Sequence, residues 1–191
     1  IEYFNCEQNS PEWLELRRGL VTASMFKTVM AQGKVKGEDS KSRREYMLKL
    51  MGERLTGDPM YTYQNEHTER GHGQEPEARD MYAFMTDLEP KPIGFIKNHG
   101  VGCSPDSLIG DDGMLEIKTK LAHLQLDVLL AGKMPAAHVA QVQGQLWVAC
   151  RKPVPTVQVT PPSTIVGVVD GLAGHAGSAA AETPAVVQRH V

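Results

Sequence analysis

The sequence contains few cysteines, and their spacing builds no recognisable site. Cys6, Cys103 and Cys150 are the three cysteines among 191 residues. Their odd number and the lack of a Cys-x-x-Cys pair argue against a disulfide framework and against a zinc or iron–sulfur centre. Such a pattern is typical of a protein that works in a reducing cytoplasm.

A long apolar run is also lacking. The longest uncharged stretch, residues 153–169, contains four prolines and cannot form a membrane-spanning helix. Near the start of the sequence, Glu2 and Glu7 stand where a signal peptide would have its apolar core. We therefore expect a cytoplasmic protein with no membrane partner.

Excess positive charge is the third missing feature. The formal net charge is −3, whereas a dedicated nucleic-acid-binding domain is more often basic. The charge is uneven, however: residues 27–54 carry eight basic and four acidic side chains, and residues 56–90 carry two basic and eight acidic ones. A basic surface beside an acidic pocket suits an enzyme that acts on a polyanion. Two solvated helix faces of opposite sign explain the same pattern equally well.

Several catalytic motifs are absent as well. The sequence has no G-x-S-x-G nucleophile turn, no H-E-x-x-H zinc helix and no phosphate-binding P-loop. Gly71-His72-Gly73 fails as a dinucleotide fingerprint because the third glycine is missing. These absences argue against the hydrolase, protease and nucleotide-binding classes that the motifs identify.

Hydrophobic periodicity predicts an α/β domain with helices on either side of a group of strands. Helical patterns cover residues 11–20, 22–30, 46–55, 65–85, 121–130 and 136–150, and strand patterns cover 92–97, 101–105 and 113–119. This order predicts one core, a central mixed β-sheet flanked by helices. Two further β patterns, at 154–160 and 164–169, complete a single domain that we place at residues 1–170.

The last residues, 171–191, differ in composition from the rest. They are rich in alanine and glycine and contain no aromatic side chain. Ordering a residue costs roughly 1–2 kcal/mol, which so little apolar surface offsets poorly. We expect this C-terminal tail to pack weakly and to contribute nothing to a functional site.

The most informative pattern is Ser104-Pro105-Asp106 followed by Glu116-Ile117-Lys118. Residues 113–119 alternate apolar and polar, so a strand there places Glu116 and Lys118 on one face. The glycines and aspartates of residues 110–113 predict a hairpin turn, which would return Asp106 beside Glu116. Two adjacent carboxylates suit a divalent cation with oxygen ligands. The alternative is a surface hairpin with an incidental salt bridge.

Four blocks of sequence, taken in order, resemble one family. They are Glu12-Trp13-Leu14-Glu15-Leu16-Arg17-Arg18-Gly19 with Thr22-Ala23-Ser24, residues 71–79 around Glu75, Cys103-Ser104-Pro105-Asp106 with Leu115-Glu116-Ile117-Lys118, and Ala140-Gln141-Val142-Gln143 with Leu146-Trp147-Val148. Together they resemble the lambda-exonuclease, or YqaJ-like, viral recombinases among the PD-(D/E)xK nucleases. The resemblance spans roughly residues 10–152 and implies a restriction-endonuclease-like core.

The resemblance implies a metal site and the residues that form it. The ligands of two Mg²⁺ ions, which Mn²⁺ can replace, would be Asp106, Glu116, the backbone carbonyl of Ile117 and Glu75. Lys118 would orient or deprotonate the attacking water. Without the resemblance, Glu75 is better explained as an exposed glutamate paired with Arg79 one helical turn away, and Glu77 is its rival for the metal. Pro76 suggests that the helix is kinked or begins there.

Gln141 is implied to lie in the active site, where its amide would bind a water or a phosphate oxygen. The residues alone favour a solvated helix face for Gln141, Gln143 and Gln145, with Val142, Leu146 and Trp147 in the core. His138 stands where the family often has tyrosine, and we favour an ordinary surface histidine.

A terminal 5′-phosphate pocket is implied at Arg17 and Ser24. The chemistry fits, because a guanidinium binds a phosphate with two hydrogen bonds and a hydroxyl at a helix start adds a further donor. The residues alone predict a surface arginine and a helix-capping serine. As a whole, the resemblance implies a Mg²⁺-dependent exonuclease of phage or prophage origin that digests linear double-stranded DNA from the 5′ end.

The implied product is a 3′ single-stranded tail for recombination, the implied partner is a single-strand annealing protein, and the implied assembly is a homotrimer. One alternative is a related nuclease of other polarity or an endonuclease, since metal motifs do not encode direction. Another is a DNA-binding subunit without catalysis, against which the intact set of Asp106, Glu116 and Lys118 argues.

Overall fold

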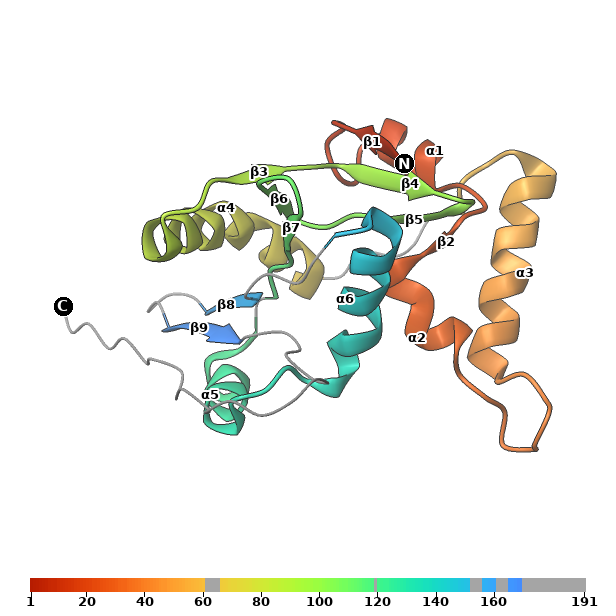
Figure 1. Ribbon diagram of the computed structural model, residues 1–191. Helices are drawn as coiled ribbons and strands as arrows, with labels where there is room; N and C mark the ends of the chain where they lie inside the picture. Colours follow the sequence, from red (N-terminus) through yellow and green to blue (C-terminus); the bar gives the residue numbers. More distant parts are fainter. Residues whose placement is uncertain (61–65, 119, 152–155, 161–164, 170–191) are drawn as a thin grey trace.

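The fold is a mixed sheet and a smaller antiparallel sheet, covered by helices (Figure 1). A computed structural model describes residues 1–60, 66–118, 120–151, 156–160 and 165–169, so the tail predicted at 171–191 lies outside the described residues. The elements in chain order are β1 (Glu2–Phe4), α1 (Pro11–Arg17), β2 (Val21–Thr22), the 3-10 turn η1 (Ala23–Met25), α2 (Phe26–Val29), α3 (Lys41–Thr56), α4 (Glu66–Thr86), β3 (Pro90–Pro92), β4 (Phe95–Asn98), β5 (Val101–Cys103), β6 (Ser107–Ile109), β7 (Gly113–Leu115), α5 (Ala122–Ala131), α6 (Ala136–Ala149), β8 (Thr156–Thr160) and β9 (Ile165–Val169).

The strands confirm the predicted mixed sheet and divide it into parts. The larger sheet has the order β1-β4-β5-β2, in which β2 runs parallel to β5 and the other neighbours are antiparallel. The second sheet, β3-β6-β7, is antiparallel throughout, and β8 and β9 pair as a hairpin. Helix α6 packs on β4 and β5 (Figure 1). This α/β arrangement matches the predicted fold class.

Helix ends follow the capping residues of the sequence. Ser10 caps α1 by accepting a hydrogen bond from the Trp13 amide at 3.2 Å, with Pro11 as the first helical residue. Helix α1 ends at Arg17, earlier than the predicted residue 20. Gly57 ends α3 in the left-handed conformation, with φ of 78°, which a glycine adopts without steric cost.

Helix α4 runs through Pro76, so of the two alternatives for this proline, a kink or a helix start, the helix start is wrong. The helix starts ten residues earlier, at Glu66. The ends of α4, at residues 66 and 86, lie close to the predicted 65 and 85.

Two predicted strands are shorter than expected because their hydrogen-bond partners change. The pattern at 92–97 is split between β3 and β4, since Gly94 binds Phe4 and Trp13 rather than one continuous neighbour. The pattern at 113–119 ends at Leu115. The next inward-facing amide, that of Ile117, donates to the Asp106 carboxylate instead of a strand carbonyl.

The main core lies between α6 and the strands. Its members are Ala23, Ile93, Ile96, Cys103, Met114, Val142, Leu146, Val148 and Ala149. Gly144 lets α6 approach α2, because a Cβ at this position would lie 2.5 Å from the Phe26 ring. Trp147, which the sequence predicts in the core, is instead 63% exposed, and the centre of its ring lies 6.1 Å from that of Phe26.

A second core cluster joins α4 to the hairpin and contains Ala78, Tyr82, Ile109, Leu115 and Ile117. Leu115 and Ile117 lie in this cluster as predicted, whereas Met114 belongs to the main core and Glu116 is also buried, so both faces of the strand are covered. Among the helices of the described residues, none combines the length and the apolar character that crossing a bilayer requires.

Candidate active site

The hairpin of β6 and β7 brings the two carboxylates of the central motif together. Ser107 pairs with Leu115, so Asp106 and Glu116 are the next residues in register. The Asp106 amide donates to the Leu115 carbonyl at 3.2 Å, and the Ile117 amide donates to Asp106 Oδ2. Both carboxylates are buried. The predicted return of Asp106 to the side of Glu116 is therefore present.

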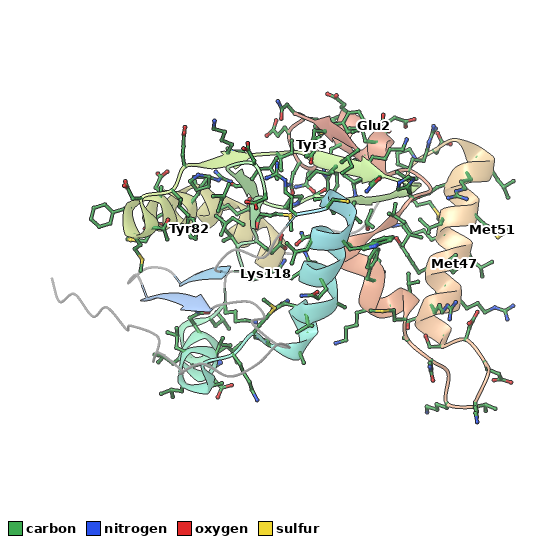
Figure 2. All side chains as sticks on the ribbon, in the orientation of Figure 1. Glu2, Tyr3, Met47, Met51, Tyr82 and Lys118 are labelled. Atoms are coloured by element: carbon green, nitrogen blue, oxygen red, sulfur yellow. The ribbon has the colours of Figure 1, made fainter. Side chains whose placement is uncertain are left out.

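Helix α6 and Lys118 hold the Glu116 carboxylate from two sides. Gln141 Nε2 and Lys118 Nζ both donate to Oε1, the lysine at 2.7 Å. Gln145 Nε2 donates to Oε2 at 2.7 Å and lies 3.4 Å from the Ser104 carbonyl oxygen. Figure 2 shows Lys118 beside α6. Gln141 thus lies in the site, and the solvated-face interpretation fits Gln143 only, which is exposed.

Helix α4 supplies the third carboxylate. Glu75 and Asp106 line the same pocket of about 850 Å³, whose opposite wall is the loop of residues 5–9. Glu77 is exposed and is not among the pocket residues, so the position favours Glu75 over its rival. Arg79 also lines this pocket, and its Nε donates to Ser107 Oγ at 2.8 Å, which ties α4 to β6.

The three carboxylates repel one another. Burial raises the pKa of Asp106 well above its usual range, and the negative charges of Glu116 and Glu75 raise it further. Burial alone would lower the pKa of Lys118, but Glu116, Asp106 and Glu75 raise it above the ordinary value. The lysine is therefore fully charged, and one ammonium faces three carboxyl groups.

This donor set fits a divalent cation, although it does not yet form a complete coordination shell. Within the described residues, no three histidine, cysteine or acidic side chains are close enough to hold a metal as they stand. Burial and the charges of Glu116 and Glu75 raise the pKa of Asp106, and Gln145 Oε1 is buried without a hydrogen-bond partner among these residues. A hydrated Mg²⁺ suits both features, because it takes one or two carboxylates directly and keeps several waters as donors.

The proposed phosphate residues lie where two parallel strands end. Thr22 of β2 is in register with Gly102 of β5, so Ser24 and Ser104 follow their strands at the same sheet edge. Arg17 Nη1 donates to Ser104 Oγ at 3.3 Å, and Trp13 Nε1 donates to the same oxygen at 2.9 Å. Ser104 thus links Arg17 to the loop that carries Asp106.

The Arg17 side chain is fixed before any ligand binds. Its guanidinium lies 3.9 Å from the centre of the Trp13 ring, a cation–π contact. Burial lowers the pKa of Arg17 to about 10, so the group stays charged at neutral pH. The prediction of a plain surface arginine does not hold, whereas Ser24 is exposed and its Oγ lies 3.2 Å from Thr22 Oγ1.

Hydrogen bonds from helix α3 hold the turn between Arg17 and Ser24, which we call the Arg17 corner. The buried Glu53 accepts a hydrogen bond from the Gly19 amide at 2.7 Å, and Arg54 Nε donates to the Gly19 carbonyl at 2.7 Å. Tyr46 Oη lies 3.3 Å from the Thr22 amide and 3.4 Å from the Leu20 carbonyl oxygen. These bonds hold the turn between α1 and β2, and with it the place of Arg17 and Ser24.

Sequence reasoning missed three residues of the site. Gln145, Ser104 and Trp13 each bond directly to a predicted site residue or to its loop. The available signal for Gln145 was its spacing of four from Gln141, which places both on one helix face. His138 is half-buried and bonded to Lys120 rather than lying freely on the surface.

The comparison with protein families identifies the family of this chain. The family described as the YqaJ-like viral recombinase domain matches residues 12–152. The chain belongs to this family. The matched range spans the residues of the candidate site.

Solved structures agree with the family. An alkaline exonuclease from Laribacter hongkongensis is 29% identical, with a TM-score of 0.71 over 84% of this chain and 82% of that chain. The same enzyme in complex with dAMP gives a TM-score of 0.69 over the same shares, at 29% identity. A phage-related exonuclease from Haemophilus somnus 129PT, 16% identical, shares the fold with a TM-score of 0.56 over 78% of this chain and 71% of that chain. The comparison with curated proteins found no match.

Proposed function

We propose that this YqaJ-family protein is a metal-dependent deoxyribonuclease, a 5′-to-3′ exonuclease that acts on linear double-stranded DNA. The observation that carries the proposal is that Glu116 and Glu75 lie close enough to raise the pKa of the buried Asp106, while Lys118 pairs with Glu116 and Arg17 bonds to Ser104. The structural neighbour at 29% identity is an alkaline exonuclease, and its dAMP complex shows that a mononucleotide binds that protein.

Each residue has a role that its surroundings support. Asp106, Glu116, Glu75 and the Ile117 carbonyl would hold Mg²⁺, or Mn²⁺ in its place, as a pair of ions. When bound, such ions would supply a lower pKa for the attacking water and charge stabilisation at the attacking and leaving oxygens of the phosphodiester.

Lys118 would exchange its bond to Glu116 for one to the attacking water or to a phosphoryl oxygen, where its charge offsets the charge developing there. Gln141 and Gln145 hold the Glu116 carboxylate in one orientation. Gln141 is the less buried of the two, and its amide would also reach a phosphate oxygen.

The polarity rests on the corner that Arg17, Ser24 and Ser104 form. A terminal 5′-phosphate carries one more negative charge than an internal phosphodiester, and a fixed guanidinium with two hydroxyls binds it selectively. With the terminal phosphate held there, the next phosphodiester of the same DNA strand would lie towards Asp106. Cleavage of that strand would leave the complementary strand as a 3′ single-stranded tail.

A ring of three copies is our proposal for the assembly, and two complementary surfaces support it. The outer side of α3 exposes Met47, Leu48, Met51 and Leu55, and this helix carries five basic against two acidic side chains (Figure 2). At the other end of the molecule, the end of α4 exposes Phe84 and Met85 among residues 77–89, which carry four acidic side chains and one basic (Figure 1). Two different patches favour head-to-tail contacts, which close into rings.

The remaining parts of the proposal concern the setting. The 3′ tails would be passed to a single-strand annealing protein, and the protein would act in the cytoplasm of a bacterial host as a phage or prophage product. Membership of a viral recombinase family supports the phage or prophage origin.

The test uses one assay with three substrates. Linear duplex with 5′-phosphate ends, the same duplex with 5′-hydroxyl ends and a covalently closed circle are incubated with Mg²⁺ and with a chelator. We expect Mg²⁺-dependent loss of the linear duplex, faster for the phosphorylated ends, and an intact circle. Cutting of the circle would instead establish the endonuclease alternative, and equal rates on the two linear ends would remove the 5′-phosphate pocket.

A further inference from the structure

Lys120, two residues after Lys118, also contacts helix α6. Lys120 Nζ lies 3.3 Å from Nε2 of His138, which belongs to the first turn of α6. His138 and Gln141 are three residues apart and share one face of the helix. Two side-chain hydrogen bonds therefore join this chain segment to α6, one between Glu116 and Gln141 and one between Lys120 and His138.

The hydrogen bond between Lys120 and His138 lies in a region of unbalanced positive charge. Burial of the ring and the charges of Lys120, Lys118 and Lys27 lower the pKa of His138 to about 4. His138 is therefore neutral at cellular pH, and its Nε2 accepts the hydrogen bond from Lys120. The ion pairs among the described residues include Lys118, with Glu116, and include neither Lys27 nor Lys120.

Such a cluster favours an anionic ligand for the same reason that the carboxylates favour a cation. Lys27 comes from α2 and is exposed, whereas Lys120 is half-buried and held in place by His138. Neighbouring ammonium groups repel one another, and the N-terminal end of α6 adds its partial positive charge. An anion placed among these groups would remove the repulsion and meet several hydrogen-bond donors.

We propose that Lys27, Lys120 and His138 form a subsite that binds a backbone phosphate adjacent to the scissile phosphate, on the same DNA strand. The proposal rests on the proposed nuclease function. DNA carries one charge per nucleotide on each strand, so a strand with its scissile phosphate at Lys118 has another phosphate close by. His138 accepts through Nε2, which leaves its Nδ1–H as a donor, and it acts as a positioning residue for Lys120.

The first test measures DNA binding without cleavage. The affinity of the full chain for a short fluorescent duplex is measured at a series of salt concentrations, with a chelator present to prevent cleavage. The proteins compared are the unmutated one, Lys27→Ala, Lys120→Ala and the control Lys97→Ala. Lys97 belongs to β4, lies opposite Glu2 in the sheet, and is not among the charges that act on His138. Each lost phosphate contact should reduce the slope of log affinity against log salt by about 0.9 for the two subsite variants and leave the control unchanged.

The second test locates the phosphate. A neutral methylphosphonate replaces one linkage at a time in the strand to be cut, at the four linkages nearest the scissile one. We expect one position at which the replacement weakens binding of the unmutated protein about as much as Lys120→Ala does, and at which the two changes together add little. Full additivity at every position would overturn the subsite.

The role of His138 is tested by two substitutions of similar size. His138→Gln keeps an acceptor for Lys120 and should retain most of the salt dependence, whereas His138→Leu should lower the slope as Lys120→Ala does. Equal slopes for the two would contradict the positioning role. Because these measurements report binding alone, a protein that uses the subsite but does not cut DNA would contradict the proposed function and leave the subsite standing.

Discussion

The two halves of the candidate site solve opposite electrostatic problems. Around Asp106, buried carboxylates repel one another, and the charge of Lys118 offsets part of this repulsion. The Arg17 guanidinium, in contrast, already has a cation–π contact with Trp13 and a hydrogen bond to Ser104. The acidic half therefore gains stability when a ligand of opposite charge arrives, whereas the basic half is built and held before the ligand binds.

This difference predicts opposite effects of mutation on stability. Removing a charge from the acidic half relieves repulsion and desolvation, so activity falls while the metal-free fold becomes more stable. Removing Arg17 takes away packing and hydrogen bonds that the fold already uses, so specificity and stability fall together. Sites under selection for chemistry often carry such a stability cost.

The largest effect is expected from Asp106→Asn. The amide keeps an acceptor for the Ile117 amide but loses the charge that a metal requires. Since metal ions supply several kcal/mol of charge stabilisation and about 1.4 kcal/mol corresponds to a factor of ten, cleavage of linear duplex should fall by about 10³-fold or more. The melting temperature without metal should rise. The matched control is Asp111→Asn in the exposed turn of the same hairpin, which should change neither quantity.

Lys118→Ala should reduce turnover by about 10²-fold or more, because it removes a donor placed where charge develops. Metal binding should persist, because the carboxylates stay in place. Single-turnover cleavage and Mn²⁺ titration of the same sample separate the two quantities. If Lys118→Ala lost metal binding along with activity, the lysine would belong to the metal site instead.

Arg17→Ala should abolish the preference for 5′-phosphate ends and lower the stability of the fold. The cation–π contact with Trp13 is worth about 0.5–2 kcal/mol. Arg17→Lys keeps the charge without the two-pronged geometry and should recover only part of the preference. Rates on phosphorylated and unphosphorylated duplex, together with thermal unfolding, measure both effects, and an unchanged rate ratio would contradict the role of this corner.

The pH dependence of stability should also differ between the halves. The raised pKa of Asp106 means that the folded protein binds this proton more tightly than the unfolded chain, whose value is about 3.9. Metal-free stability should therefore be lost as pH rises from about 4 through the raised pKa of the folded state. Asp106→Asn should remove this loss, and added Mg²⁺ should restore more stability at the higher pH. A flat curve for the unmutated protein would show that Asp106 titrates normally.

Truncation after Asp170 is expected to have the smallest effect. Every residue assigned to the site lies before position 152, and the removed segment holds no aromatic side chain. Metal-dependent cleavage should persist with little change in melting temperature. Loss of soluble protein, or a change of oligomeric mass, would show that residues 171–191 stabilise the core or an interface.

Local signals predicted the acidic half well. The glycine and aspartate turn and the period of two were sufficient to pair Asp106 with Glu116, because a hairpin is determined by its own residues. The caps at Ser10 and Gly57 were equally local. The position of Glu75 depended on the family pattern, since one glutamate on a polar helix resembles another.

Features that depend on tertiary packing could not be read from the sequence. Gln145 and Gln143 are chemically identical, and the way in which α6 packs on the sheet buries Gln145 and leaves Gln143 exposed. The break between β3 and β4 arises because Gly94 binds β1 and α1, which lie far away in sequence. The exposure of Trp147 likewise depends on how α2 meets α6.

The central claim is that the three carboxylates hold a divalent cation, and calorimetric titration with Mn²⁺ tests it most directly. The account predicts saturable binding to the unmutated protein and to Arg17→Ala, and a loss of that binding in Asp106→Asn. Equal binding by Asp106→Asn and the unmutated protein would contradict the account.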